Sequence, residues 1–148
     1  MSQTRRLRAV VDTNTLFQMA AAVERSPLFV AWQASHFTLA LSEELLAEFV
    51  RISVRPRLNC YLPASRAVRF VALLRAGAMF VEPSVSADMP QCRDIQDNKV
   101  IATAIAARAD FIVTNDHDLH DPLLAARLHA EYGIRVAWPV EFLAAIRN

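Results

Sequence analysis

The sequence predicts an α/β fold in which helices cover both faces of a parallel β-sheet. Short apolar runs alternate along the chain with longer segments whose apolar residues recur at helical spacing, a pattern typical of parallel α/β folds. The chain has 148 residues, of which 54% are hydrophobic and 21% charged. This length and composition fit one packed domain over residues 1–148, able to bury a core without disulfides or a structural metal.

Local signals place the elements in order. Strands are expected at residues 7–12, 37–41, 78–81, 110–114 and 134–137. Helices are expected at residues 13–20, 27–34, 43–52, 63–76, 97–109, 122–132 and 139–146. Thr13 to Thr15 and Ser42 can cap helices, and Pro27 suits a first helical turn. Gly77 is expected just after a helix, as the C′ residue that stops it, and Gly133 is expected to stop another.

Charge and cysteine content exclude several classes of protein. The formal net charge is +1, and Lys99 is the only lysine beside fifteen arginines. This balance argues against non-specific coating of DNA, although nucleic acid can still bind at a local patch. Cys60 and Cys92 lack zinc-type spacing and are expected to be free thiols. No apolar run has the roughly 20 residues of a membrane span, and no signal-peptide pattern is present, so a cytoplasmic protein is expected.

Aspartates gather around the ends of the predicted strands, the edge where open parallel sheets bind ligands. Asp12 follows the first strand, and Asp116 and Asp118 follow the fourth. Asp94 lies in the longest predicted loop, and Asp97 opens the next helix, so both can reach the same edge. Long loops tend to be functional.

Three glutamates lie on the helix after the second strand. Glu43 and Glu44 are explained as first-turn charges favoured by the helix macrodipole, whereas apolar neighbours indicate partial burial of Glu48. Asp12 ends a strand that should be buried, and a carboxylate is rarely buried unless it is paired or binds a metal. A helix-capping role for Asp12 stays open.

Converging carboxylates repel one another unless cations lie among them. Oxygen ligands alone select hard ions such as Mg²⁺ or Mn²⁺. Such ions activate water and stabilise a leaving oxygen in phosphoryl chemistry. The residues therefore predict metal-assisted hydrolysis of a phosphodiester.

Four motifs occur in order along the chain: Val11–Asn14, Leu41–Glu48, Cys92–Lys99 and Val113–Leu119. Together they resemble the PIN domain family, above all bacterial members described as toxins of type II toxin–antitoxin systems, relatives of the VapC group. The resemblance covers Val10 to Phe142. It implies a PIN-like three-layer α/β/α fold with a five-stranded parallel sheet and a metal-dependent endoribonuclease site that acts on RNA.

The resemblance also implies roles for individual residues. Asp12, Asp97 and Asp116 would hold Mg²⁺ or Mn²⁺, and Glu48 would complete the cluster or orient the attacking water. Spacing alone does not prefer Glu48 over Glu44. Polar support would come from Asn14, Ser42, Thr114 and Asn115, with Asp118 as an outer ligand. Asn98 stands where relatives often carry an acid, which weakens the case for a second metal more than for the first.

Basic residues offer candidate contacts to RNA. These are Arg51, Arg55 and Arg57, just beyond the helix that carries Glu48, with a solvated surface as the alternative. Lys99 flanks the acids, with an ordinary charge partner for Asp94 or Asp97 as the alternative. The resemblance further implies a homodimer and a cognate antitoxin protein as partners.

Other readings are less consistent with the residues. A haloacid-dehalogenase phosphatase needs an aspartate where this chain has Asn14, and a receiver domain needs a lysine after a late strand. A non-catalytic PIN-like domain that binds RNA or protein is the main alternative, and acids at all four implied positions argue against it. His117 and His120 are expected to be solvated rather than metal ligands.

Overall fold

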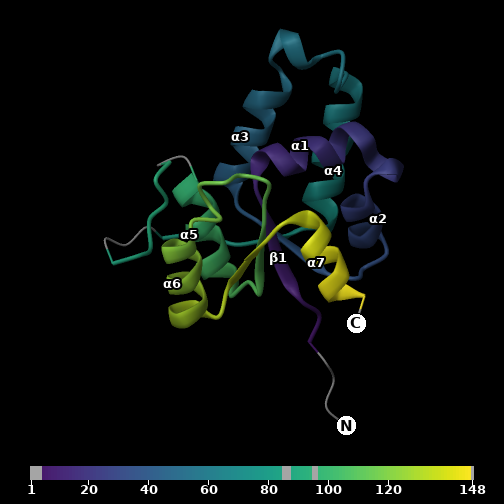
Figure 1. The fold of residues 1–148 in the computed structure, drawn as a ribbon. Coiled ribbons are helices and arrows are strands. Elements are labelled where there is room, and N and C mark those ends of the chain that lie inside the picture. Colours follow the sequence, from purple (N-terminus) through teal and green to yellow (C-terminus); the bar gives the residue numbers. More distant parts are fainter. Residues whose placement is uncertain (1–4, 85–87, 95–96, 148) are drawn as a thin grey trace.

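The computed structural model describes residues 5–84, 88–94 and 97–147. Its centre is a five-stranded, all-parallel sheet with the order β3-β2-β1-β4-β5 (Figure 1). The strands are β1 (Arg8–Val11), β2 (Thr38–Leu41), β3 (Met79–Phe80), β4 (Phe111–Val113) and β5 (Arg135–Ala137). The predicted α/β fold with five parallel strands is confirmed.

Helices cover both faces of this sheet. They are α1 (Thr13–Ala22), α2 (Pro27–Gln33), α3 (Glu43–Ser53), α4 (Ala64–Gly77), α5 (Asn98–Ala107), α6 (Pro122–Tyr132) and α7 (Pro139–Ile146). From β1 the chain adds β2 and β3 on one side, and it then returns to add β4 and β5 on the other side of β1. Because such crossovers are right-handed, this change of direction puts α5 and α6 on the face of the sheet opposite α1 to α4. Figure 1 shows α5 and α6 on one side of β1, and α2 and α7 on the other.

Several predicted helix boundaries are confirmed. The Ser42 hydroxyl accepts the Leu45 N–H at the start of α3, and Pro27 lies in the first turn of α2. Gly133 ends α6 with a left-handed φ of 69°, which glycine adopts without steric cost.

The helix expected to reach residue 109 ends at Ala107, because Arg108 takes a left-handed φ of 52°.

Two predicted helix boundaries are wrong. Asp12, not Thr13 to Thr15, caps α1, because the helix begins directly after the strand and the Asp12 carboxylate accepts the Thr15 N–H at 3.0 Å. Gly77 is the last residue of α4 and is followed by extended backbone at Ala78, so it is not a left-handed stop. A Cβ at Gly77 would lie 3.3 Å from Trp32, and glycine therefore permits close packing of α4 on α2.

The core continues to the end of the described chain. Phe142 of α7 is fully buried, and its ring packs edge-on against Phe37 at 4.9 Å and Phe111 at 5.1 Å between centroids. The loop predicted at residues 83–96 contains no helix or strand in its described part, and residues 85–87 and 95–96 lie outside the described residues. None of the described helices combines the length and apolar character needed to cross a membrane.

Candidate metal centre

The candidate site lies where the strand order reverses, between β1 and β4. Val11 of β1 pairs with Val113 of β4, so Asp12 and Thr114 leave the sheet side by side. The crevice beyond the carboxyl ends of strands at such a reversal is where parallel α/β folds bind ligands. The fold therefore brings residues about one hundred positions apart to a single edge.

Asp12 is held rigidly at that edge. Its side chain is buried, one oxygen accepts the Thr15 N–H at 3.0 Å, and the other accepts the Thr114 hydroxyl at 2.7 Å. The capping role left open by the sequence is thus real. It does not preclude ion binding, because each carboxylate oxygen carries two lone pairs and can accept more than one interaction.

Thr114 also shapes the loop after β4. Its hydroxyl accepts the Asp116 N–H at 2.9 Å, and the Asp116 carboxylate accepts the Asp118 N–H at 2.9 Å. These short side-chain to backbone turns fix the direction of the loop. One hydroxyl therefore links the acid after β1 to the acids after β4.

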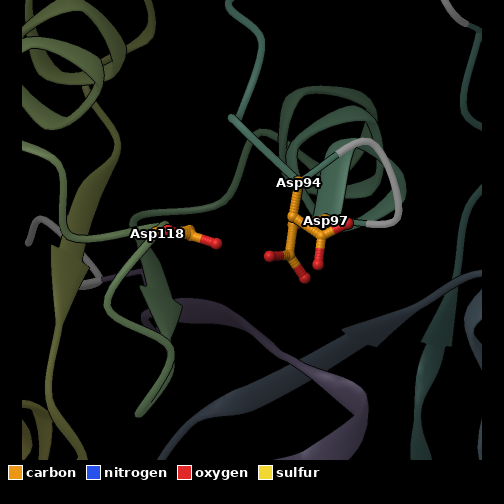
Figure 2. Close-up of side chains that lie close together, drawn as sticks. All are labelled: Asp94, Asp97 and Asp118. Carbon is orange, nitrogen blue, oxygen red and sulfur yellow. The ribbon is translucent and has the colours of Figure 1, made fainter.

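Three carboxylates lie close together beside the loop after β4, and one of them belongs to the loop. Asp94, Asp97 and Asp118 each place one oxygen so that all three oxygens lie within 4.8 Å of one another. Figure 2 shows Asp94 and Asp97, from the segment that enters α5, facing Asp118 across a short gap. The Asp97 N–H donates to the Asp94 carbonyl at 3.0 Å, which brings the two side chains together. An all-oxygen donor set of this kind suits a hard divalent cation.

The pKa of Asp97 reflects its burial and the repulsion between the carboxylates of the site. Burial, the hydrogen bond with Asp116 and the negative charges of Asp116, Asp94 and Asp12 raise the pKa of Asp97 to about 8. Four aspartates thus interact closely enough that one of them holds its proton near neutral pH. A bound divalent cation would reverse this penalty, so the residues present fit a metal.

Glu48 and Ser42 are placed differently from the aspartates. Glu48 lies half-buried on α3, and within the described part of the chain it belongs neither to the three-carboxylate group nor to the acids that raise the pKa of Asp97. Ser42 is buried at the N-terminus of α3, and its hydroxyl lies 3.0 Å from that of Thr103 in α5. Ser42 therefore connects two helices behind the site.

The remaining candidates lie around the acids. A cavity of about 690 Å³ beside α1 and α3 is lined by Asn14 and Asn115 together with Asp12, Asp116 and Asp118. Arg51, Arg55 and Arg57 are exposed on the last turn of α3 and the segment after it, and Lys99 is half-buried in the first turn of α5. Asn98 accepts the Cys92 N–H at 2.6 Å and so anchors the loop that carries Asp94.

The structure brings Asp12, Asp97, Asp116 and Asp118 together and adds Asp94. The sequence pattern predicts Asp94 at the same edge but indicates no role for it in the site. The available signal was its spacing of three residues from Asp97, which allows a single turn to bring both carboxylates to one point.

A comparison with family models matches the larger part of the chain. A model described as PIN domain matches residues 8–118, a stretch that contains β1 to β4 and every aspartate of the site. No curated protein matches the chain. β5 and α7 lie beyond the matched stretch, although β5 is paired with β4 in the sheet.

Proposed function

The chain belongs to the PIN domain family, and on that basis we propose that it is a metal-dependent endoribonuclease that hydrolyses RNA phosphodiester bonds. PIN domains are in general nucleases. The observation that carries the proposal is the group of aspartates at the β1–β4 edge, where burial, a hydrogen bond with Asp116 and the neighbouring negative charges raise the pKa of Asp97 to about 8. Such a site is stable in its ionised form when a divalent cation neutralises it.

We assign the ligands from the chain's own contacts. Asp94, Asp97 and Asp118 would hold Mg²⁺ or Mn²⁺, with Asp12 and Asp116 as further ligands, directly or through water. A bound ion supplies Lewis-acid polarisation of the phosphate and a nucleophilic water at neutral pH. Thr114 keeps Asp12 and Asp116 in position through its two hydrogen bonds.

Other residues have proposed supporting roles. Glu48 would orient the attacking water from α3, and Asn14 and Asn115 would line the path of the substrate. Arg51, Arg55, Arg57 and Lys99 remain candidates for phosphate contacts. Their guanidinium and ammonium groups suit the charge of an RNA backbone.

Removal of the metal tests the proposal directly. Cleavage of single-stranded RNA is expected to stop in excess chelator and to return with Mg²⁺ or Mn²⁺, while circular dichroism shows a folded protein throughout. Cleavage at full rate in chelator would rule the mechanism out. RNA binding without products at any metal concentration would instead favour the non-catalytic PIN-like alternative.

We also propose that the protein forms a homodimer. Val54 and Val68 are 67% and 70% exposed, and together with Val50 and Val71 they line an apolar groove of about 450 Å³ between α3 and α4. Exposed apolar surface of this kind often marks a protein interface. Light scattering at micromolar concentration is expected to give the mass of two chains, and a mass of one chain would contradict the proposal.

A toxin role in a type II toxin–antitoxin system is the finer proposal. It is supported by the resemblance of the four motifs to bacterial PIN toxins. The partner would be an antitoxin protein that places a cationic side chain near the aspartates, because a cation can take the place of the metal charge. A small DNA-binding protein encoded beside this gene would support the role.

A further inference from the structure

We propose that a cavity next to the aspartates binds one unpaired nucleoside of the RNA substrate, an inference that rests on the proposed function. The cavity has a volume of about 820 Å³, within the roughly 300–1,000 Å³ of typical small-molecule sites. Asp118 lines this cavity and also belongs to the three-carboxylate group. A phosphate held at the aspartates would therefore place its neighbouring nucleoside in the cavity.

Aromatic rings form one wall of the cavity. The imidazole of His120 stacks on the indole of Trp138 with ring centroids 3.6 Å apart and planes inclined by 10°. His117 meets the same indole edge-on at 5.3 Å. Planar rings of this kind bind nucleobases by stacking with little preference for sequence, because every base has a π-face.

The aromatic wall and the aspartates are fixed to the same residue. His120 Nε2 lies 2.8 Å from the carbonyl oxygen of Thr114. A carbonyl only accepts, so Nε2 carries the hydrogen and Nδ1 is left as an acceptor in the neutral ring. The hydroxyl of Thr114 donates to Asp12. Thr114, at the end of the rigid strand β4, therefore sets the distance between the aromatic wall and the metal site.

The surroundings favour a nucleoside within a strand over an isolated small molecule. His117 and Asp118 also line the 690 Å³ cavity beside α1 and α3, so the two cavities meet at these residues. A single strand could pass from one cavity to the other across the aspartates. Arg93 is exposed and also lines the larger cavity, and its guanidinium suits the phosphate on the far side of the bound nucleoside. A base that enters such a cavity cannot be paired in a duplex.

Nuclear magnetic resonance of the tryptophan indoles tests the site without any cleavage. The chain has two tryptophans, Trp138 in the cavity and Trp32, which is buried in α2. Uridine and adenosine are expected to shift the Trp138 indole N–H signal and to leave that of Trp32 unchanged, whereas ribose shifts neither. An unmoved Trp138 signal, or an equal shift with ribose, would overturn the inference.

Substitution separates recognition of the base from general effects. Removing one stacking ring weakens base binding by about 5-fold or more, so His117→Ala is expected to raise both the nucleoside Kd and the KM for single-stranded RNA by at least that factor. His36→Ala, which removes an exposed histidine outside the cavity, is the matched control. Equal nucleoside affinities in the two variants and the native chain would show that the aromatic wall does not bind the base.

The binding and cleavage results also separate this inference from the proposed function. Nucleoside binding in a protein that cleaves no RNA would support the cavity and remove the nuclease proposal. Metal-dependent cleavage with no nucleoside-induced shift at Trp138 would leave the nuclease proposal standing and overturn the nucleoside site alone.

Discussion

Asp97→Asn is expected to lower metal-dependent RNA cleavage by about 100-fold or more. Asparagine keeps the shape of the side chain but removes the charge that holds a hard divalent ion. Metal activation is worth several kcal/mol of transition-state stabilisation, and each 1.4 kcal/mol is a factor of ten in rate. Asp97 lies within the fields of Asp116, Asp94 and Asp12, so it occupies the centre of the negative charge.

Asp94→Asn tests whether Asp94 is a metal ligand, as the structure indicates, or only a loop or capping residue. A loop or capping residue would tolerate asparagine, but the Asp94 oxygen lies within 4.8 Å of those of Asp97 and Asp118. We therefore expect a loss of about tenfold or more in metal affinity and in single-turnover cleavage, because removing even a residue that only supports a metal ligand costs about 10–100-fold. Glu44→Gln, at an exposed first-turn position, is the control. Native cleavage in both aspartate variants would place the metal elsewhere.

The same measurements decide the role of α3. Glu48 is half-buried and Glu44 is exposed on the same helix. If Glu48 orients the attacking water, Glu48→Gln lowers the cleavage rate while metal affinity stays near that of Glu44→Gln. Equal rates for the two variants would remove Glu48 from the site.

The fold follows from the sequence because its determinants are local. Alternating apolar runs predict the strands, and Ser42 and Gly133 mark helix ends through contacts within four residues of themselves. The sequence pattern wrongly predicts Gly77 as a C′ residue, for a physical reason. Glycine is needed at this position because Trp32 packs close to its backbone. Trp32 is distant in sequence, so residues near Gly77 in the chain do not indicate this contact.

The candidate site was predictable only in part. The ends of parallel strands point to Asp12 and Asp116, because every such fold presents that edge to ligands. The contact from Thr114 to Asp12 spans 102 positions and depends on the pairing of β1 with β4. Asp94 depends on the path of a loop that has no periodicity, and His120 and Trp138 come together only in the folded chain.

The metal-free protein is expected to lose stability as the pH rises from about 4 to about 8. The pKa of Asp97 is about 8 in the folded chain, against about 4 for an unperturbed aspartate. Between these values the folded state keeps a proton that the unfolded state has released, so the free energy of unfolding falls as the pH increases. Well below pH 4 and well above pH 8, Asp97 carries the same number of protons in both states, so its contribution to the pH dependence ends.

The size of the fall is limited by solvent. One proton gives at most about 1.4 kcal/mol per pH unit, and screening around a partly exposed side chain reduces the total to about 1–3 kcal/mol. For a chain of this length the corresponding drop in Tm is about 3–9 °C. Added Mg²⁺ is expected to restore the lost stability at pH 8, because it binds the ionised folded state and not the unfolded chain.

Asp97→Asn isolates the group responsible. With no charge to form at this position, the variant in chelator should unfold at nearly constant Tm from pH 5 to pH 9. At pH 9 it should be more stable than the native chain, although its metal-dependent cleavage is about 100-fold lower or more. Glu44→Gln, which leaves the cluster intact, should keep the native pH dependence. Thermal unfolding followed by circular dichroism measures all three proteins. A native chain whose Tm is flat or rises between pH 5 and pH 8, or an Asp97→Asn variant whose Tm falls in parallel with it, would show that the raised pKa of Asp97 does not set the pH dependence of stability.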